Sequence, residues 1–349
     1  RDTRRATMTG SGSPGMYTVR AVAAFSRNLL RFGCSKVHVR GLDRFVSVLT
    51  DPSRRAAGTG LLTYCNHISV LDEPTIWGCL PKELFRDPRT VRWTLGASDI
   101  MFRGKLLSDF FTNGQCIETH RGGGIFQPAI DTSIDKLDGG DWIHLFPEGY
   151  VNVSTSTRLR RFKWGIARML LEAQTLPTVV PIWLSGFDRL MPEPRSWPNW
   201  MPRLGNEVTI HFGEPIQDQL APAVAAVKQT GSLPIDLLPE NLQSSIARIQ
   251  ADIENSQNST TTTSSGSSST AHSKSAFAAE SETVEKATAR SQIAALLRYH
   301  LALVGQAHRR AIGQDPLVEG TLCHQESLRP SHEHPDKVLP DGERKSAGV

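Results

Sequence analysis

The sequence lacks the features that several common protein classes require. Its five cysteines are scattered and odd in number, and no CxxC pair or Cys/His metal spacing occurs in the 349 residues. We therefore expect neither a disulfide framework nor a structural zinc. No run of about 18 or more uninterrupted apolar residues is present, so we expect no simple membrane-spanning helix. The Gly-x-Ser-x-Gly motif is also absent, which argues against an α/β-hydrolase.

The net charge is too small to identify a class of partner. The overall value is only +4, and we expect no nucleic-acid partner. The charge is unevenly placed, however, because residues 1–49 contain two acids and nine basic residues: Arg1, Arg4, Arg5, Arg20, Arg27, Arg31, Lys36, Arg40 and Arg44. An Arg-rich, acid-poor start is typical of mitochondrial targeting.

Residues 16–33 have the pattern of an amphipathic helix that ends near Gly33. Apolar residues recur on one side and arginines on the other: Val22, Phe25, Leu29 and Phe32 against Arg20, Arg27 and Arg31. A basic amphipathic helix can lie in a membrane interface. It can equally pack on a domain with its arginines in solvent, and the pattern alone does not decide between the two.

The central part of the chain alternates between two patterns. Short apolar runs predict strands at 61–65, 115–117, 141–146, 178–184 and 208–212. Between them, helical patterns lie at 74–80, 124–138 and 160–174. Strands that alternate with helices predict an α/β domain.

The composition changes in the last third of the chain. A helical pattern over 236–254 is followed by Ser256–Ser275, which is almost entirely small or polar and predicts a disordered linker. A further helix is expected at 280–312, and the polar tail from Gly313 is expected to be disordered. We thus divide the chain into a basic N-terminal segment, a central domain, a linker, a C-terminal helix and a tail: 1–35, 36–255, 256–275, 276–312 and 313–349.

The most informative motif is His67-x₄-Asp72, between an apolar run and a helical pattern. The two side chains would not share one face of a regular helix, so we expect His67 on a loop and Asp72 in the first helical turn. Asn66, Ser69 and Asp72 are all good residues for a helix start. Asp72 would then orient a His67 base, and the substrate hydroxyl would replace a protein nucleophile. We also expect backbone amides at the helix start to stabilise the oxyanion. The same spacing is common by chance.

Two further segments carry candidate site residues. Arg121, flanked by glycine after the predicted strand at 115–117, can present a guanidinium to a phosphate, or can be a solvated loop arginine. Phe146-Pro-Glu148-Gly149 follows another strand, where glycine permits close approach of a ligand and Glu148 can hydrogen-bond a substrate hydroxyl. It can also be an ordinary turn. The basic cluster that follows can meet anionic headgroups or be solvated: Arg158, Arg160, Arg161 and Lys163.

The order and spacing of these motifs resemble the glycerolipid acyltransferase family, over roughly residues 60–215. The resemblance rests on five segments: Asn66-His-x-Ser-x-x-Asp-x-Pro74, Trp93-Thr with Ala97-x-Asp99, Cys116…Arg121-Gly122, Gly140-Asp-Trp-x-His-x-Phe-Pro-Glu-Gly149-x-Val-Asn152, and Arg161-Phe-Lys-Trp-Gly-Ile-x-Arg168. It implies a glycerol-3-phosphate acyltransferase-like α/β domain with a central mixed sheet flanked by helices. It also implies His67 and Asp72 as the catalytic pair. Five residues would bind substrate: Arg121, Glu148, Gly149, Asn66 and Ser69.

The segments are most similar to a mitochondrial branch of that family. The resemblance implies acyl exchange between phospholipids and lysophospholipids, with cardiolipin and phosphatidylcholine among them, without coenzyme A or a metal. It implies peripheral binding to a mitochondrial membrane, on leaflets that face the intermembrane space. The first helix and the Trp/Pro-rich segment 191–202 are the candidate membrane contacts.

Two alternative functions stay open at the level of the sequence. The same pair, His67 and Asp72, would serve a lysophospholipid acyltransferase that takes its acyl chain from acyl-coenzyme A. The chain could also be a non-catalytic membrane-binding protein in which the motifs are a relic, although His67, Asp72 and Glu148 are all intact. The sequence says nothing about the oligomeric state.

Overall fold

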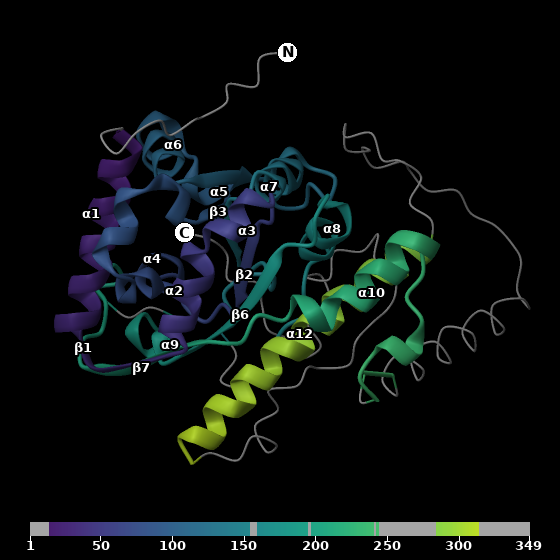
Figure 1. Cartoon of the computed structure of the whole chain (residues 1–349). Coiled ribbons are helices and arrows are strands. Elements are labelled where there is room, and N and C mark those ends of the chain that lie inside the picture. Colours follow the sequence, from purple (N-terminus) through teal and green to yellow (C-terminus); the bar gives the residue numbers. More distant parts are fainter. Residues whose placement is uncertain (1–13, 154–158, 195–196, 241, 244–283, 314–349) are drawn as a thin grey trace, which may run out of the picture.

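The computed structural model describes residues 14–153, 159–194, 197–240, 242–243 and 284–313. These residues form a seven-stranded mixed sheet in the order β1-β7-β6-β2-β5-β3-β4, flanked by helices (Figure 1). Neighbouring strands pair in parallel except for β6 and β7, which are antiparallel. The strands are β1 Cys34–Arg40, β2 Leu61–Cys65, β3 Trp93–Ala97, β4 Cys116–Thr119, β5 Trp142–Leu145, β6 Thr178–Ser185 and β7 Asn206–Phe212.

The central strands are buried on both faces, which explains their continuous apolar sequence. In β2, Leu62 and Tyr64 join the hydrophobic cluster on one face, whereas Leu61 and Cys65 join the cluster on the other. Such alternation follows from the two-residue period of a strand. The polar residue between them, Thr63, is satisfied because its hydroxyl accepts a 2.8 Å hydrogen bond from the indole of Trp142.

The helices divide between these two clusters. One cluster contains residues of α7 Pro128–Asp138, α8 Gly165–Glu172, α10 Gln217–Thr230 and α12 Val284–Ala311. The other contains residues of α1 Pro14–Asn28, α2 Leu42–Thr50, α4 Asp72–Ile76, α9 Phe187–Leu190 and the short helices η1 Leu29–Gly33, η2 Trp77–Cys79 and η3 Lys82–Arg86. The remaining short elements are α3 Pro52–Ala56, η4 Pro88–Thr90, α5 Ser98–Met101, α6 Gly104–Asn113 and η5 Ile235–Leu237.

The predicted α/β domain with a mixed central sheet is confirmed, and all five predicted strands are present. The strands β1 and β3 are additional, as are several helices, of which α2, α6 and α10 are the longest. Two helices begin later than predicted. Pro128 occupies the first turn of α7, where its missing N–H costs nothing. Helix α8 begins at Gly165 because residues 160–163 form a loop that binds the turn at Glu148.

The N-terminal helix packs on the domain, but not by the predicted face. Its buried residues include Met16, Val19 and Ala23, whereas Phe25 and Phe32 are exposed. The arginines on the other side bind the protein: Arg20 Nε donates to the Phe85 carbonyl and Arg27 Nη2 to the Leu80 carbonyl. Amphipathic spacing identified the helix, but not which of its sides packs against α4, η2 and η3.

Helix α12 lies within the predicted helical segment 280–312 and contributes to the core. Leu297 and Leu301 are fully buried in the same cluster as α8 and α10, and α12 lies against β6 and α8. Its Leu297 carbonyl accepts a 2.8 Å hydrogen bond from the Tyr64 hydroxyl on β2. Only the start of the predicted 236–254 helix is described. The predicted linker and tail lie outside the described residues, so the proposed division into domains stays a prediction.

Candidate active site

Three of the sequence motifs meet at one edge of the sheet. His67 follows β2, Glu148 follows β5 and Arg121 follows β4. These strands run parallel to one another or to shared neighbours, so their carboxyl ends lie at the same edge. Ligands of open α/β sheets bind at this edge. Segments that are separated by up to about eighty residues in the sequence therefore form one site.

His67 and Asp72 form the predicted pair. His67 lies on the loop after β2, and Asp72 is the first residue of α4. His67 Nδ1 lies 3.0 Å from Asp72 Oδ2, so the predicted geometry is confirmed. Because the carboxylate fixes Nδ1 as the N–H donor, Nε2 is the nitrogen that can accept a proton.

The loop before α4 supplies two backbone amides to Asp72. The N–H groups of Ile68 and Ser69 donate to Asp72 Oδ2 at 2.7 and 2.8 Å. These loop amides hold the orienting carboxylate, and the stabilisation of an oxyanion by amides of the helix start stays a prediction. The loop thus folds around Asp72 and turns the imidazole of His67 toward the cavity.

Asp72 is a fully buried carboxylate. Burial raises its pKa, and the hydrogen bond and charge of His67 and the N–H groups of Ser69 and Ile68 oppose that rise. The second carboxylate oxygen, Oδ1, has no hydrogen-bond partner in the structure. His67 and the two loop N–H groups therefore all contact the same carboxylate oxygen, Oδ2.

Glu148 holds the same loop from the opposite side. It is 2% exposed, and its Oε1 accepts a 2.9 Å hydrogen bond from the backbone N–H of His67. Its Oε2 accepts from Asn152 Nδ2 at 3.1 Å and from the Arg160 N–H at 2.9 Å. In return, the His67 carbonyl accepts from the Asn152 N–H at 2.6 Å. Burial raises the pKa of Glu148, and these donors oppose the rise.

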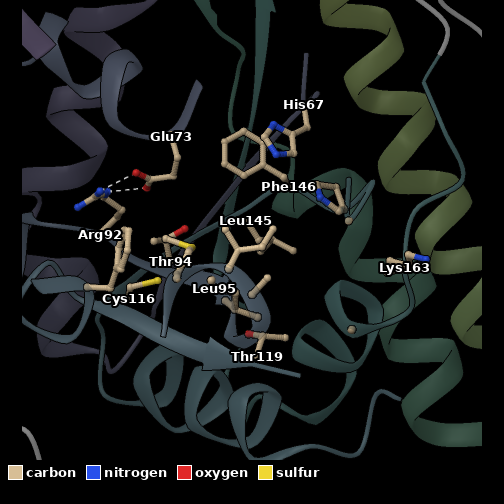
Figure 2. A pocket seen from close by; sticks show the side chains of 18 of the residues that line it. His67, Glu73, Arg92, Thr94, Leu95, Cys116, Thr119, Leu145, Phe146 and Lys163 are labelled. Atoms are coloured by element: carbon tan, nitrogen blue, oxygen red, sulfur yellow. Dashed lines mark hydrogen bonds and ion pairs between the residues drawn. The ribbon is translucent and has the colours of Figure 1, made fainter. Parts of the chain in front are cut away.

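A cavity of about 980 Å³ opens in front of His67. The imidazole lies against the ring of Phe146, with ring centroids 4.2 Å apart (Figure 2). Most of the lining is apolar and comes from α1, β3, α5, α6 and the segments that follow β4 and β5. This volume suits a large ligand, and its apolar lining suits acyl chains.

One wall of the cavity is cationic. It carries Arg121, Arg161 and Lys163. Arg121 Cζ and Lys163 Nζ lie 5.1 and 5.3 Å from the centroid of the Tyr150 ring. Arg121 also contacts Asp99 Oδ2 at 3.3 Å. The sequence therefore brings Arg121 to the cavity as predicted, and the basic cluster after Gly149 contributes two further cations.

The other predicted substrate-binding residues divide into two groups. Gly149 lines the cavity with φ at +78°, and a Cβ there would lie 2.9 Å from Lys163 Cε. Asn66, Ser69 and Glu148 are buried behind the lining. Asn66 exchanges two hydrogen bonds with the backbone of Leu184 on β6. These three residues hold the loop in place without lining the cavity, and their predicted contacts with substrate stay predictions.

Sequence reasoning missed an ion pair in the cavity wall. Arg92 binds Glu73 through two hydrogen bonds of 2.8 and 2.7 Å (Figure 2). Trp77 Nε1 donates to the same carboxylate at 3.2 Å. Burial acts to raise the pKa of Glu73, but Arg92 reverses the effect and the pKa is lowered. Glu73 adjoins Asp72 on a helix of five residues, so this clamp fixes the start of α4. The signal for this ion pair in the sequence was the acidic residue directly after the His-x₄-Asp motif.

A second missed residue is His144 on β5. It is completely buried, and burial lowers its pKa to about 3, so the ring is neutral. Its Nδ1 lies 2.8 Å from the Thr63 hydroxyl and its ring packs edge-on against Trp77. It supports the cavity wall behind Phe146. In the described part of the chain, no group of three or more His, Cys, Asp or Glu residues could hold a metal ion.

Comparison with known proteins identifies the family. The family model described as Acyltransferase matches residues 36–185. The Dictyostelium discoideum protein "Taffazin" is 38% identical over 212 residues, which cover 58% of this chain and 69% of that protein. The Arabidopsis thaliana N-acylphosphatidylethanolamine synthase is 35% identical over 210 residues, which cover 59% and 72%. The chain belongs to the glycerolipid acyltransferase family.

Tafazzins are prominent among the relatives of this acyltransferase chain. Tafazzin of Drosophila melanogaster is 38% identical over 200 residues. That match covers 57% of this chain and half the length of the Drosophila protein. The family resemblance read from the motifs is thus confirmed. The solved 1-acyl-sn-glycerophosphate acyltransferase of Thermotoga maritima aligns with a TM-score of 0.43 at 18% identity, over 62% of this chain and 79% of that one.

Proposed function

We propose that the protein is a phospholipid–lysophospholipid transacylase that remodels the acyl chains of cardiolipin. The observation that carries the proposal is the His67–Asp72 pair, joined at 3.0 Å, at the wall of a large and mostly apolar cavity. The similarity to several tafazzins supports it. The site needs no protein nucleophile, because the acceptor lipid supplies a hydroxyl.

In this mechanism His67 first accepts a proton and then gives it up again. Its Nε2 accepts the proton of the lysophospholipid hydroxyl as that oxygen attacks the acyl carbonyl of the donor phospholipid. The new ester C–O bond forms and the donor ester C–O bond breaks. The departing oxygen of the donor takes the proton back from Nε2, so the donor leaves as a lysophospholipid. Acid–base catalysis of this kind contributes about 10²–10⁴ in rate.

The two buried carboxylates have separate roles in this mechanism. Asp72 keeps the proton of neutral His67 on Nδ1 and stabilises the imidazolium that forms during the transfer. Glu148 acts on the backbone of His67 and fixes where the loop places the ring. Only His67 meets the reacting atoms, and both carboxylates are positioning residues.

The cationic wall suits the phosphates of the lipid substrates. Arg121, Arg161 and Lys163 line the cavity, and Lys163 lies beside Gly149. Guanidinium groups bind phosphate oxygens in a bidentate manner. A glycerolipid would place its headgroup at this wall and its acyl chains in the apolar part. We propose cardiolipin and phosphatidylcholine as substrates on this basis.

The proposed place of action is the surface of a mitochondrial membrane, on leaflets that face the intermembrane space. The Arg-rich N-terminal composition supports a mitochondrial protein. In the part of the chain that the structure describes, no helix is both long and apolar enough to span a bilayer. Fractionation of mitochondria followed by carbonate extraction tests the proposal. Protein that remains with the membrane after extraction would contradict peripheral binding.

The decisive experiment tests which acyl donor is used. Purified protein is incubated with labelled phosphatidylcholine and a lysophospholipid, once alone and once with acyl-coenzyme A. The proposal predicts transfer of label without coenzyme A, with monolysocardiolipin as acceptor. Transfer that begins only when acyl-coenzyme A is added would instead show a thioester-dependent acyltransferase.

A second acceptor widens the same assay. One relative is named an N-acylphosphatidylethanolamine synthase, so phosphatidylethanolamine is included to test acylation of an amine. A His67 base serves an amine as well as a hydroxyl, since both lose a proton on acylation. The proposal predicts that the lysophospholipid is the faster acceptor, and faster labelling of phosphatidylethanolamine would overturn that choice.

A further inference from the structure

Helix α6 is an amphipathic helix that buries none of its residues. Leu106, Leu107 and Phe110 fall on one side and are 84%, 43% and 44% exposed. The other side carries Lys105 and Asp109, which pair with each other at 2.5 Å. The apolar side of a surface helix normally faces the core of its own protein. Here that side faces outward, so the core of the protein does not cover it.

Helix α1 continues this surface. Its exposed residues are all uncharged: Pro14, Tyr17, Ala21, Ala24, Phe25 and Asn28. Its arginines are turned to the protein, where they bind carbonyl groups of η2–η3. Helices α1 and α6 are in contact, and α1 runs away from α6 along the side of the molecule (Figure 1). An outward helix side without charge extends the apolar surface beyond α6.

The far end of α1 leads to a second exposed group. The N–H of Gly205 donates to the Gly33 carbonyl at 2.7 Å, which ties the end of segment 197–204 to the turn after α1. In this segment Trp197, Trp200 and Leu204 are 90%, 71% and 65% exposed. Tryptophan prefers the headgroup level of a bilayer, because its ring is apolar and its N–H is polar. The docking face, as we define it, consists of α6, the outward side of α1 and segment 197–204.

The cavity opens onto the docking face. Phe25, Val70, Ile100 and Phe110 line the cavity and are each at least 41% exposed. They form an apolar opening of the cavity, beside α1, α5 and α6. An acyl chain that entered here would pass from one apolar environment to another without crossing water. Because this surface is continuous with the lipid cavity, the partner that fits it is a lipid bilayer.

We propose that the docking face lies on the membrane interface, with the apolar side of α6 below the headgroups and segment 197–204 at their level. The inference rests on the proposed function for the identity of the cavity's ligand. It assigns to α6 a role that the sequence did not indicate, and it places this opening of the cavity directly over the bilayer. The protein would then extract a lipid chain without leaving the surface.

Vesicle flotation of the purified full-length protein tests the face. The vesicles contain phosphatidylcholine and cardiolipin. Two variants, Leu106→Ser/Leu107→Ser and Trp197→Ser/Trp200→Ser, remove large side chains of the face that do not line the cavity. The matched control, Leu303→Ser/Ile312→Ser, removes exposed side chains of α12 and the turn after it, which are 40% and 47% exposed. Each face variant should bind at least about tenfold more weakly, since one buried large side chain is worth roughly a factor of ten, and the control should bind within about twofold of wild type.

Other outcomes would overturn the inference. Unchanged binding of both face variants, or equal loss in the control, would show that the face does not meet the bilayer. A dimer in light scattering that Leu106→Ser/Leu107→Ser abolishes, with binding unchanged, would assign the face to a second copy of the chain.

The failure of this inference and the failure of the proposed function are distinguishable. On short-chain substrates dissolved below their micellar concentration, the face variants should keep wild-type turnover. His67→Ala should lose turnover yet bind vesicles normally. Face variants that bind like wild type contradict the docking face alone, and full turnover by His67→Ala contradicts the proposed function alone.

Discussion

The loop after β2 and the turn after β5 both place a buried carboxylate against His67, but by different means. Asp72 is five residues from His67 and bonds its side chain. Glu148 is 81 residues away and bonds its backbone N–H. Asp72 also accepts hydrogen bonds from amides of its own loop, whereas Glu148 accepts hydrogen bonds from Asn152 and Arg160. The first carboxylate acts on the chemistry of the imidazole, and the second fixes the position of its loop.

The difference shows which contacts of the site form within one loop and which require the folded sheet. Asp72 and its donors all lie between His67 and Asp72 itself, so the loop can form this arrangement wherever β2 ends. The arrangement around Glu148 requires β2 and β5 to be neighbours in the sheet. Loss of Asp72 should therefore change the reaction, and loss of Glu148 should change the structure on which the reaction depends.

The largest effect is expected for His67→Ala. Removal of the base should lower acyl transfer by about 10²–10⁴-fold, with folding retained because the ring is at the cavity wall. The rate is measured with labelled phospholipid and lysophospholipid, and folding by circular dichroism. Turnover within a few-fold of wild type would show that His67 is not the base, and the two carboxylates would then have no catalytic group to position.

Asp72→Asn comes next. The amide keeps the size of the side chain but not its charge, so the imidazolium that forms during transfer loses its partner. We expect a loss of about a hundredfold or more in kcat, as for orienting carboxylates of catalytic triads, with little change in KM. The kinetics are measured with varied lysophospholipid. A change confined to KM would mean that Asp72 acts on substrate binding instead.

Glu148→Gln should have a smaller effect on activity. Three N–H donors point at the carboxylate, and the amide group of glutamine would oppose one of them. An unsatisfied buried donor costs about 1–3 kcal/mol, so we expect a lower melting temperature and roughly ten- to a hundredfold less turnover. The matched control is Glu118→Gln, because Glu118 is an exposed carboxylate on β4 of the same sheet. Equal effects of the two changes would contradict the role of Glu148.

The same variant has a defined pH dependence. Burial raises the pKa of Glu148 in the folded protein, above the unfolded value of about 4.3. A raised carboxyl pKa contributes stability that is present below the unfolded pKa and is lost as pH rises through the folded pKa. The glutamine side chain of the variant does not titrate. The melting temperature of Glu148→Gln should therefore improve relative to wild type as pH rises through this window, and a difference that stays constant would contradict the raised pKa.

The smallest effect is expected for Tyr64→Phe, which extends the comparison to α12. The hydroxyl is buried and donates to the Leu297 carbonyl, so its loss should cost about 1 kcal/mol of unfolding free energy. Turnover should be unchanged at a temperature where the variant is folded. Urea unfolding measures the first effect. A loss of turnover larger than the loss of stability would indicate that α12 acts on the site directly.

The distinction between contacts within one segment and contacts between distant segments explains what the sequence could predict. The strands β2 and β5 and the geometry of His67 and Asp72 follow from local patterns, so they could be predicted. The side of α1 that packs on the domain could not, because apolar residues such as Met16, Tyr17 and Phe25 lie on different sides of this helix. Strand β3 was missed because its five residues mix apolar and small side chains. Helix α6 was missed because it is only ten residues long and its N-cap, Arg103, is not a capping residue. The bond from Glu148 to His67 requires the strand order, which no local pattern contains.

The central claim is that His67 and Asp72 act as one catalytic unit. The direct test is the rate of labelled acyl transfer for His67→Ala, Asp72→Asn and the double variant. Residues that act as a unit are strongly non-additive, so the account predicts that the double variant is within about twofold of His67→Ala alone. A double variant slowed by the full product of the two single effects would contradict it.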